Sequence, residues 1–125
     1  MNARRLIIAA EVRRRAQLRS TASTLLESCF AQQREFVEAV LARDVRRIAL
    51  LCARRAGKSW GIAVAICVLC LSKPNVRVIW LGLTQRNIKR FAWDIMSTLN
   101  IRFRLGLIPN KSDLKWIFPN GSTLE

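Results

Sequence analysis

The stretch "IALLCARRAGKSWGIAVAICVLCL", residues 48–71, decides the fold. It begins with an apolar run of strand length, residues 48–51, and passes through two arginines and Gly-Lys-Ser into a second apolar run. Residues 60–71 are apolar nearly all round, which is typical of a helix buried against a sheet. A strand, a loop with Gly-Lys-Ser and a helix, in that order, form the context in which phosphate-binding loops occur.

The loop departs from the usual pattern at one position. A phosphate-binding loop reads Gly, four residues, then Gly-Lys-Ser or Gly-Lys-Thr. Here Cys52 stands in place of the first glycine, and the four middle residues are Ala53, Arg54, Arg55 and Ala56. The first glycine eases a turn but contacts no phosphate through a side chain. A small residue such as cysteine is therefore compatible with the loop where its dihedral angles suit the turn.

Each remaining position of the loop has a chemical reason. Backbone N–H groups from Ala53 to Ser59 would form a cradle for phosphates, helped by the positive end of the helix dipole. Gly57 allows the backbone to approach closely. Lys58 would bridge the β- and γ-phosphates, and Ser59 would offer its hydroxyl to Mg²⁺. The pattern predicts ATP and Mg²⁺ as cofactors; the alternative is an ordinary Lys-Ser at a helix start.

Hydrophobic periodicity predicts the elements around this loop. Residues 29–44 are expected to form a helix, because apolar residues recur at three- and four-residue spacing. Residues 76–83 are rich in β-branched residues and predict a second strand, and residues 85–99 predict another helix. Beyond Asn100 we expect short strands, with a hairpin turn at "PNGS", residues 119–122. The prediction is an α/β fold: an incomplete parallel sheet flanked by helices, with a right-handed crossover.

The amino-terminal segment, residues 1–28, is strongly basic and ends in a Ser/Thr-rich stretch. We expect a basic helix followed by a break, preceding a second part that spans residues 29–125. Three interpretations stay open: a solvated helix or flexible arm, an arm that contacts DNA, and an organelle transit peptide. The arginines of this segment are Arg4, Arg5, Arg13, Arg14, Arg15 and Arg19.

Composition bounds the partners. The chain has 125 residues, about one domain, and 22 Lys and Arg against 8 Asp and Glu give a formal net charge of +14. Polyanions are therefore the natural partners: nucleic acid, nucleotide phosphates or an anionic membrane surface. The apolar run "IAVAICVLCL", about ten residues long, is too short to span a bilayer.

The four cysteines are not spaced as a disulfide framework, which favours a reducing compartment. Cys67 and Cys70 form a C-x-x-C, but a zinc site would lack ligands because the chain has no histidine and no second cysteine pair. We interpret both as small buried hydrophobic residues. The tryptophans are likewise expected in the core rather than as base-stacking platforms: Trp60, Trp80, Trp93 and Trp116.

Four motifs together resemble one family. "QREFV", "CARRAGKS", "VIWLGLTQRN" and "LKWIFPNGSTLE" are similar to the amino-terminal ATPase domain of the terminase large subunit, the DNA-packaging motor of tailed bacteriophages and related viruses. Proteins of that family often have a loop that lacks the first glycine and carries an arginine. The resemblance covers residues 30–125 in order, and it implies a P-loop NTPase fold of the RecA-like (ASCE) class.

The resemblance also implies roles for individual residues. An upstream glutamine that contacts adenine is matched by Gln33, with Gln32 as the second choice. Arg54 best matches the arginine that reaches the γ-phosphate and stabilises charge in the transition state, so Lys58 and Arg54 are the expected catalytic residues. Arg55 would face DNA or a neighbouring subunit. The alternative for either arginine is a solvated loop charge.

The family implies a motor that couples ATP hydrolysis to translocation of duplex DNA in the host cytoplasm. Its expected partners are DNA, the portal, the small terminase subunit and further copies of the chain, with no membrane. The sequence departs from the family because no hydrophobic strand ending in Asp-Glu (Walker B) and no nuclease domain follow. The acids after the loop are Asp94, Asp113 and Glu125.

We therefore expect the front part of a terminase that binds ATP without turnover by itself. The alternative is a basic nucleic-acid-binding remnant or a helicase-like P-loop ATPase fragment without turnover.

Overall fold

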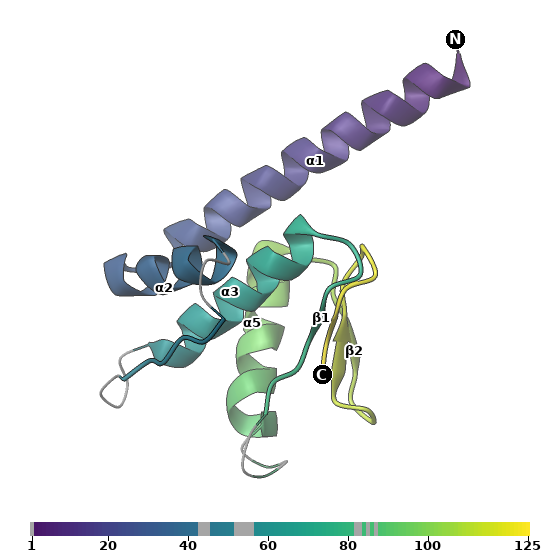
Figure 1. Ribbon diagram of the computed structural model, residues 1–125. Coiled ribbons are helices and arrows are strands. Elements are labelled where there is room, and N and C mark those ends of the chain that lie inside the picture. The colour runs from purple at the N-terminus through teal and green to yellow at the C-terminus, as the bar shows by residue number, and fades with distance from the viewer. Residues whose placement is uncertain (1, 43–45, 52–56, 82–83, 85, 87) are drawn as a thin grey trace.

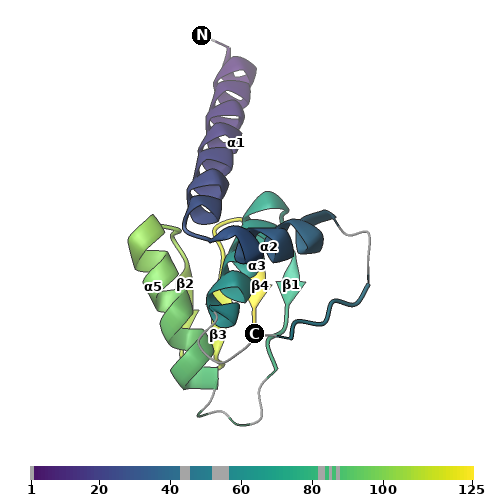
Figure 2. The same cartoon turned by 90° about the vertical axis from the view of Figure 1, so that its left-hand side faces the viewer.

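The computed structural model describes residues 2–42, 46–51, 57–81, 84, 86 and 88–125 (Figure 1). In these residues the chain is an α/β protein with a small mixed sheet. Helices α2 (Ala31–Ala42), α3 (Lys58–Ser72) and α5 (Asp94–Phe103) lie on the same side of the sheet, and α1 (Ala3–Glu27) projects from the body (Figures 1 and 2). Helix α3 is the centre of the fold because it contacts α1, α2, α5 and the sheet.

Helix α3 confirms the predicted buried helix. It begins at Lys58, directly after Gly57, and ends at Ser72 before the extended residue Lys73. Nine of its fifteen residues are buried, in keeping with a sequence that is apolar on every side.

The sheet has four short strands in the order β1-β4-β3-β2: β1 (Arg77–Val78), β2 (Ile108–Asn110), β3 (Lys115–Ile117) and β4 (Thr123–Leu124). Strand β1 pairs parallel with β4, whereas β4 and β2 pair antiparallel with β3. The predicted turn at residues 119–122 does connect β3 to β4. The chain reverses there through Gly121, whose φ of 86° favours glycine.

The prediction of a strand at residues 48–51 is wrong. These residues have no regular secondary structure, and the side chains of Ile48 and Leu51 are 41% and 103% exposed. The predicted strand at residues 76–83 forms only over Arg77–Val78. Its parallel neighbour is β4. The backbone N–H groups of Thr123 and Glu125 donate to the carbonyls of Val76 and Val78. The predicted parallel pair across the Gly-Lys-Ser loop is thus absent from the described residues.

Helix α1 also departs from the prediction, because it continues through the Ser/Thr-rich stretch instead of breaking there. The hydroxyls of Thr21 and Thr24 each donate to the carbonyl four residues earlier, both at 2.9 Å, so they are satisfied within the helix. One turn later Leu25 is fully buried. The carboxyl-terminal end of α1 therefore belongs to the core of the body.

The helix predicted at residues 85–99 is confirmed in its later part and runs further than expected. It starts as a π-helical segment, Ile88–Trp93, and continues as α5 to Phe103. Arg104 ends it in the left-handed conformation, with a φ of 52°. The short strands expected beyond Asn100 start only at Ile108.

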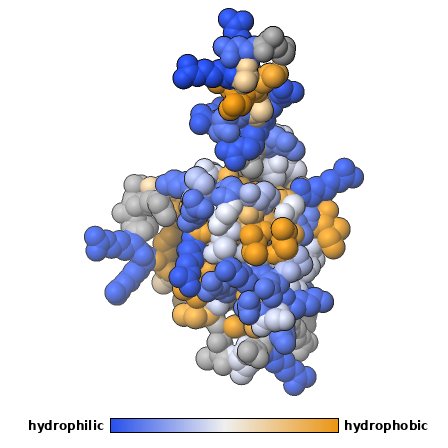
Figure 3. Space-filling view, turned by 90° about the vertical axis from the view of Figure 1, so that its right-hand side faces the viewer, coloured by the Kyte–Doolittle hydropathy of each residue, from blue (hydrophilic) through white to orange (hydrophobic). Residues whose placement is uncertain are grey.

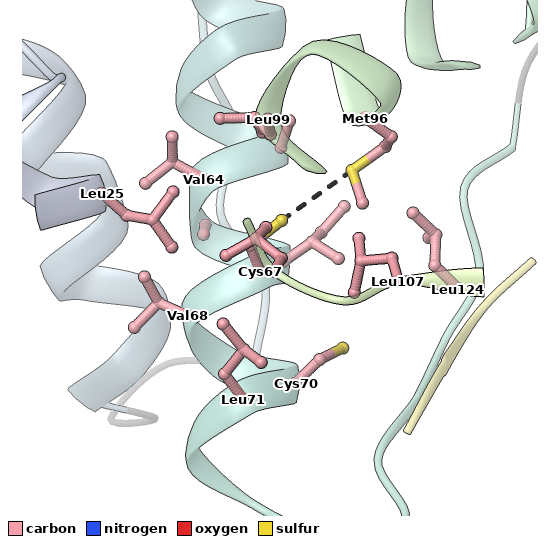
Figure 4. Packing of buried hydrophobic residues seen from close by; sticks show 14 of the residues in the cluster. Leu25, Val64, Cys67, Val68, Cys70, Leu71, Met96, Leu99, Leu107 and Leu124 are labelled. Atoms are coloured by element: carbon pink, nitrogen blue, oxygen red, sulfur yellow. Dashed lines mark hydrogen bonds between the residues drawn. The ribbon is translucent and has the colours of Figure 1, made fainter. Parts of the chain in front are cut away.

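The cysteine and tryptophan interpretations hold. Cys67 and Cys70 lie fully buried in the cluster of Figure 4, where the Cys67 thiol donates to the sulfur of Met96 at 3.9 Å. Burial raises the pKa of Cys67 to about 12 and that of Cys70 to about 11, so both stay neutral thiols. Trp116 is buried and its ring lies 4.6 Å from that of Trp93, while Trp60, Trp80 and Trp93 are half-buried against the core.

None of the described helices combines the length and the apolar character needed to cross a membrane.

Candidate phosphate-binding site

The described part of the loop is its carboxyl-terminal end, Gly57 to Ser59. Gly57 precedes the first residue of α3 and has the left-handed backbone angles φ 77° and ψ 17°, which favour glycine. Lys58 is exposed and Ser59 is half-buried in the first turn of the helix. The other predicted site residues, Ala53, Arg54, Arg55 and Ala56, lie outside the described residues together with Cys52.

Gln33 is brought directly to this loop end, although it lies 24 residues earlier in the chain. Its side-chain amide is 7% exposed. Oε1 accepts from the backbone N–H of Phe30 at 3.0 Å, and Nε2 donates to the carbonyl of Gly57 at 2.7 Å. The amide therefore links the start of α2 to the start of α3. Gln33 holds the backbone of Gly57, a role that the sequence analysis did not foresee.

The contact is tight enough to require glycine. A Cβ atom added to Gly57 would lie 2.5 Å from Nε2 of Gln33 and 3.1 Å from Cε1 of Phe30. One turn further along α3, a Cβ on Gly61 would lie 3.4 Å from Cγ of Gln33. Gly61 is a residue that the sequence analysis missed. Its signal was an isolated glycine, four residues after Gly57, inside an otherwise apolar helix.

The electrostatics of this helix start suit an anion. The carbonyl of Gly57 accepts from the N–H of Gly61 at 3.1 Å, so the helical ladder begins there. The first turn contains no acidic residue, and no side chain within the described part of the chain caps it. The amide groups of the first helical turn have no partner within the helix, and the dipole adds a positive potential. Together with the charge of Lys58, this end of α3 can attract a phosphate.

The three acids that follow the loop have structural partners or positions of their own. Glu125 pairs with Arg77 at 3.2 Å and with Lys115 at 3.7 Å, and these cations, Arg77 first, lower the pKa of its carboxyl group. Asp113 accepts from the side-chain amide of Asn110 at 3.1 Å in the β2–β3 turn. Asp94 is exposed and lies inside the continuous helix that Ile88–Trp93 and α5 form. These positions belong to the sheet, the turn and the helix.

The described residues contain no group of three or more His, Cys, Asp or Glu that could hold a metal ion. A divalent ion at this site would instead depend on the hydroxyl of Ser59 and on phosphate oxygens. That arrangement fits Mg²⁺, which usually keeps several waters and few protein ligands.

Comparisons with protein-family models, with curated proteins and with solved structures find no match to this chain. The function is therefore argued from its own residues.

Proposed function

We propose that this chain binds the phosphates of ATP, with Mg²⁺, at the amino-terminal end of α3, as part of a P-loop ATPase of the terminase large-subunit type. The observation that carries the proposal is the hydrogen bond from Gln33 to Gly57 at 2.7 Å. It joins the two motifs, "QREFV" and Gly-Lys-Ser, that nucleotide binding would need at one place. The uncapped first turn of α3, free of acidic residues, adds the electrostatic support.

In this proposal each site residue has a separate task. Backbone amides from Ala53 to Ser59 surround the phosphates, Lys58 offsets the charge of the β- and γ-phosphates, and Ser59 contacts Mg²⁺. Arg54 reaches the γ-phosphate with its planar guanidinium, which suits phosphate oxygens. Gln33 sits behind Gly57, where its amide sets the position of the loop end.

The wider function follows from the same resemblance. A protein of this type would couple ATP hydrolysis to the movement of duplex DNA, working with a portal, a small terminase subunit and further copies of itself in the host cytoplasm. Asp113 and Glu125 are poor candidates for a catalytic base because each is bound by a neighbouring side chain, and Asp94 lies within a helix. We therefore propose that the 125-residue chain binds ATP but does not turn it over.

The test uses the two lysines that flank α3. Lys58 is the first residue of α3 and Lys73 follows its last residue; both are exposed, so replacing either by alanine removes the same charge. A fluorescent ATP analogue should bind Lys58→Ala about tenfold or more weakly than the wild type, a loss of about 1.4 kcal/mol or more. Lys73→Ala should bind like the wild type. Equal affinity of the two variants would refute the phosphate site.

A second candidate function, nucleic-acid binding without any nucleotide site, is favoured by the formal charge of +14. The same pair of variants separates the two. If Lys58→Ala loses the ATP analogue but keeps DNA, the nucleotide site is separate from the DNA surface. If no variant binds the analogue and all bind DNA, the second candidate is correct.

A further inference from the structure

A concave surface lies where α1 leaves the body, at the carboxyl-terminal end of α3. One depression of about 280 Å³ and one of about 500 Å³ share Arg14, Leu71 and Asn120 in their walls. A third, of about 210 Å³, shares Thr21 and Arg104 with the first. The first depression therefore adjoins each of the other two around the middle of α1, and we name the three together the arginine groove.

The charge of the arginine groove is almost entirely positive. The arginines come from two parts of the chain that are far apart in sequence, α1 and the end of α5. Its one acidic wall residue is Glu11, which already pairs with Arg14 and Arg15, both at 3.0 Å. The arginines that line the groove are Arg14, Arg15, Arg19, Arg102 and Arg104.

The floor of the groove does not oppose a negative ligand. The carboxyl-terminal carbonyls of a helix would repel phosphate, but here the carbonyl of Cys70 and that of Lys73, just after the helix, accept hydrogen bonds. Asn120, which lines two of the depressions, donates from Nδ2 to the carbonyls of Cys70 and Lys73 at 2.6 and 3.0 Å. The remaining floor includes the apolar Leu71 and Pro119.

We propose that the arginine groove binds the sugar-phosphate backbone of duplex DNA. Guanidinium groups form paired hydrogen bonds with phosphate oxygens and release counterions from the DNA. Arg15 and Arg19 are four residues apart and line the same depression, with a rise of about 6 Å along α1. One strand of a duplex presents a phosphate about every 3.4 Å along its axis, so these two arginines span about two phosphates. Arg14 and Arg104 line the adjoining depression together.

A membrane surface fits α1 less well. The exposed apolar residues Leu6, Ile7 and Ile8 are consecutive, so they point in directions about 100° apart and form no single apolar face. In Figure 3, hydrophilic and hydrophobic residues both lie on the visible face of the projecting part of α1. A helix that lies in a membrane interface needs the two kinds on opposite faces.

The groove is separate from the proposed nucleotide site. Helix α3 has 15 residues, so its two ends are about 21 Å apart. DNA binding in the groove therefore does not rest on ATP binding at Lys58, and either can fail without the other.

The test compares two double variants that remove the same charge. Arg14→Gln with Arg104→Asn changes both sides of the groove, and asparagine tolerates the left-handed backbone of Arg104. Arg4→Gln with Arg5→Gln is the control, because these arginines lie on the projecting end of α1, outside the groove walls. Binding of a fluorescent 20-bp duplex is measured by anisotropy over a range of salt concentrations.

The groove variant should weaken DNA binding about tenfold or more at 0.1 M salt, and its slope of log affinity against log salt should fall by about 1.8, or 0.9 for each lost contact. The control should lose less than half as much. An equal or larger loss in the control would overturn the proposal, as would preferred binding to vesicles of phosphatidylcholine with phosphatidylserine.

Two measurements keep the result interpretable. Far-UV circular dichroism and affinity for the fluorescent ATP analogue should match those of the wild type if the groove variant is folded. If it is not folded, Arg15→Gln with Arg19→Gln changes only the exposed face of α1 and should give a loss of similar size. Retained DNA affinity in that second variant would overturn the proposal.

Discussion

The two ends of helix α3 are held by side chains from different parts of the chain. At its amino-terminal end the backbone of Gly57 is held by Gln33, from the preceding helix. At its carboxyl-terminal end the carbonyls of Cys70 and Lys73 are covered by Asn120 and Ser122, about 50 residues later. At the first end no described side chain caps the helix, whereas at the second end distant side chains donate to the carbonyls of Cys70 and Lys73.

This difference bears on the two anion sites that we propose. A helix favours anions at its start and disfavours them at its end. At the proposed nucleotide site, Lys58 would act together with that preference. At the proposed DNA site, Arg14 and Arg104 would act against it, and the hydrogen bonds from Asn120 and Ser122 to the carbonyl of Cys70 reduce the opposing charge.

The largest effect is expected for Gly57→Ala, at the amino-terminal end. The new methyl group would force a left-handed backbone on alanine and push Nε2 of Gln33 from its hydrogen bond, because the two atoms would lie 2.5 Å apart. We expect the free energy of unfolding to fall by about 2–4 kcal/mol. Urea unfolding followed by circular dichroism measures it.

A matched control separates backbone strain from contact. Gly106 has a similar φ, +70°, but its added Cβ would meet only Cγ of Pro119 at 3.5 Å. Gly106→Ala should therefore cost only the backbone strain, about 1–2 kcal/mol. In a Gln33→Ala background, Gly57→Ala should cost less than in the wild type, because the contact with Nε2 is gone and only the contact with Phe30 at 3.1 Å is left. If Gly57→Ala and Gly106→Ala are equal in the wild-type background, the contact of Gln33 with Gly57 does not form in solution.

The next effect is expected for Ser122→Ala, at the other end of α3. The buried hydroxyl of Ser122 accepts from the N–H of Val76 at 3.0 Å and donates toward the carbonyls of Cys70 and Lys73. Its removal takes the acceptor from the N–H of Val76, whereas both carbonyls keep their bond to Asn120; the free energy of unfolding should fall by about 1–3 kcal/mol. Ser112→Ala, in the exposed β2–β3 turn, is the control and should change stability little. A loss as large in Ser112→Ala would contradict the comparison.

The same two ends show which features a sequence can reveal. Features carried by a contiguous pattern were predicted: the buried helix at residues 60–71, the burial of Cys67 and Cys70, and the turn at residues 119–122. The proximity of Gln33 to the loop was expected only through the family resemblance, and its bond to Gly57 was not expected at all. Residues 52–56, which hold most of the predicted cradle, lie outside the described residues.

Features that depend on distant partners were missed. The apolar run at residues 48–51 has the composition of a strand, but β1 pairs with β4, which lies 46 residues away in sequence. The Ser/Thr stretch of α1 was read as a break, because local propensity does not show that Leu25 is anchored in the core. Arg104 and Arg14 line the same depression because α5 packs against α1. Tertiary contacts override local preference in each case.

A third prediction concerns the middle of α3, between its two ends. Burial raises the pKa of Cys67 from its ordinary value near 9 to about 12. Above pH 9 the unfolded chain loses this proton while the folded chain keeps it. The free energy of unfolding is therefore undiminished below pH 9 and falls as the pH rises toward 12, by about 1.4 kcal/mol per pH unit for this thiol.

Urea unfolding at pH 8 and pH 10, under reducing conditions, measures this loss. In Cys67→Ala the difference between the two pH values should shrink by about 1 kcal/mol. An unchanged difference would mean that the thiol of Cys67 is accessible to water in the folded protein, contrary to its position in the core.

The smallest effect is expected for Glu11→Gln, at the arginine groove. Arg14 first, and then Arg15, hold the pKa of the Glu11 carboxyl below its usual range, so Glu11 is ionised at neutral pH and competes with phosphate for both arginines. Glutamine should release them and tighten DNA binding by about twofold to threefold, with a steeper salt dependence. Glu27→Gln removes the same charge from an exposed position at the end of α1, outside the groove walls. Anisotropy with the 20-bp duplex at pH 7 should show a gain for Glu11→Gln alone; equal gains in both variants would mean that net charge, and not the arginine groove, governs DNA binding.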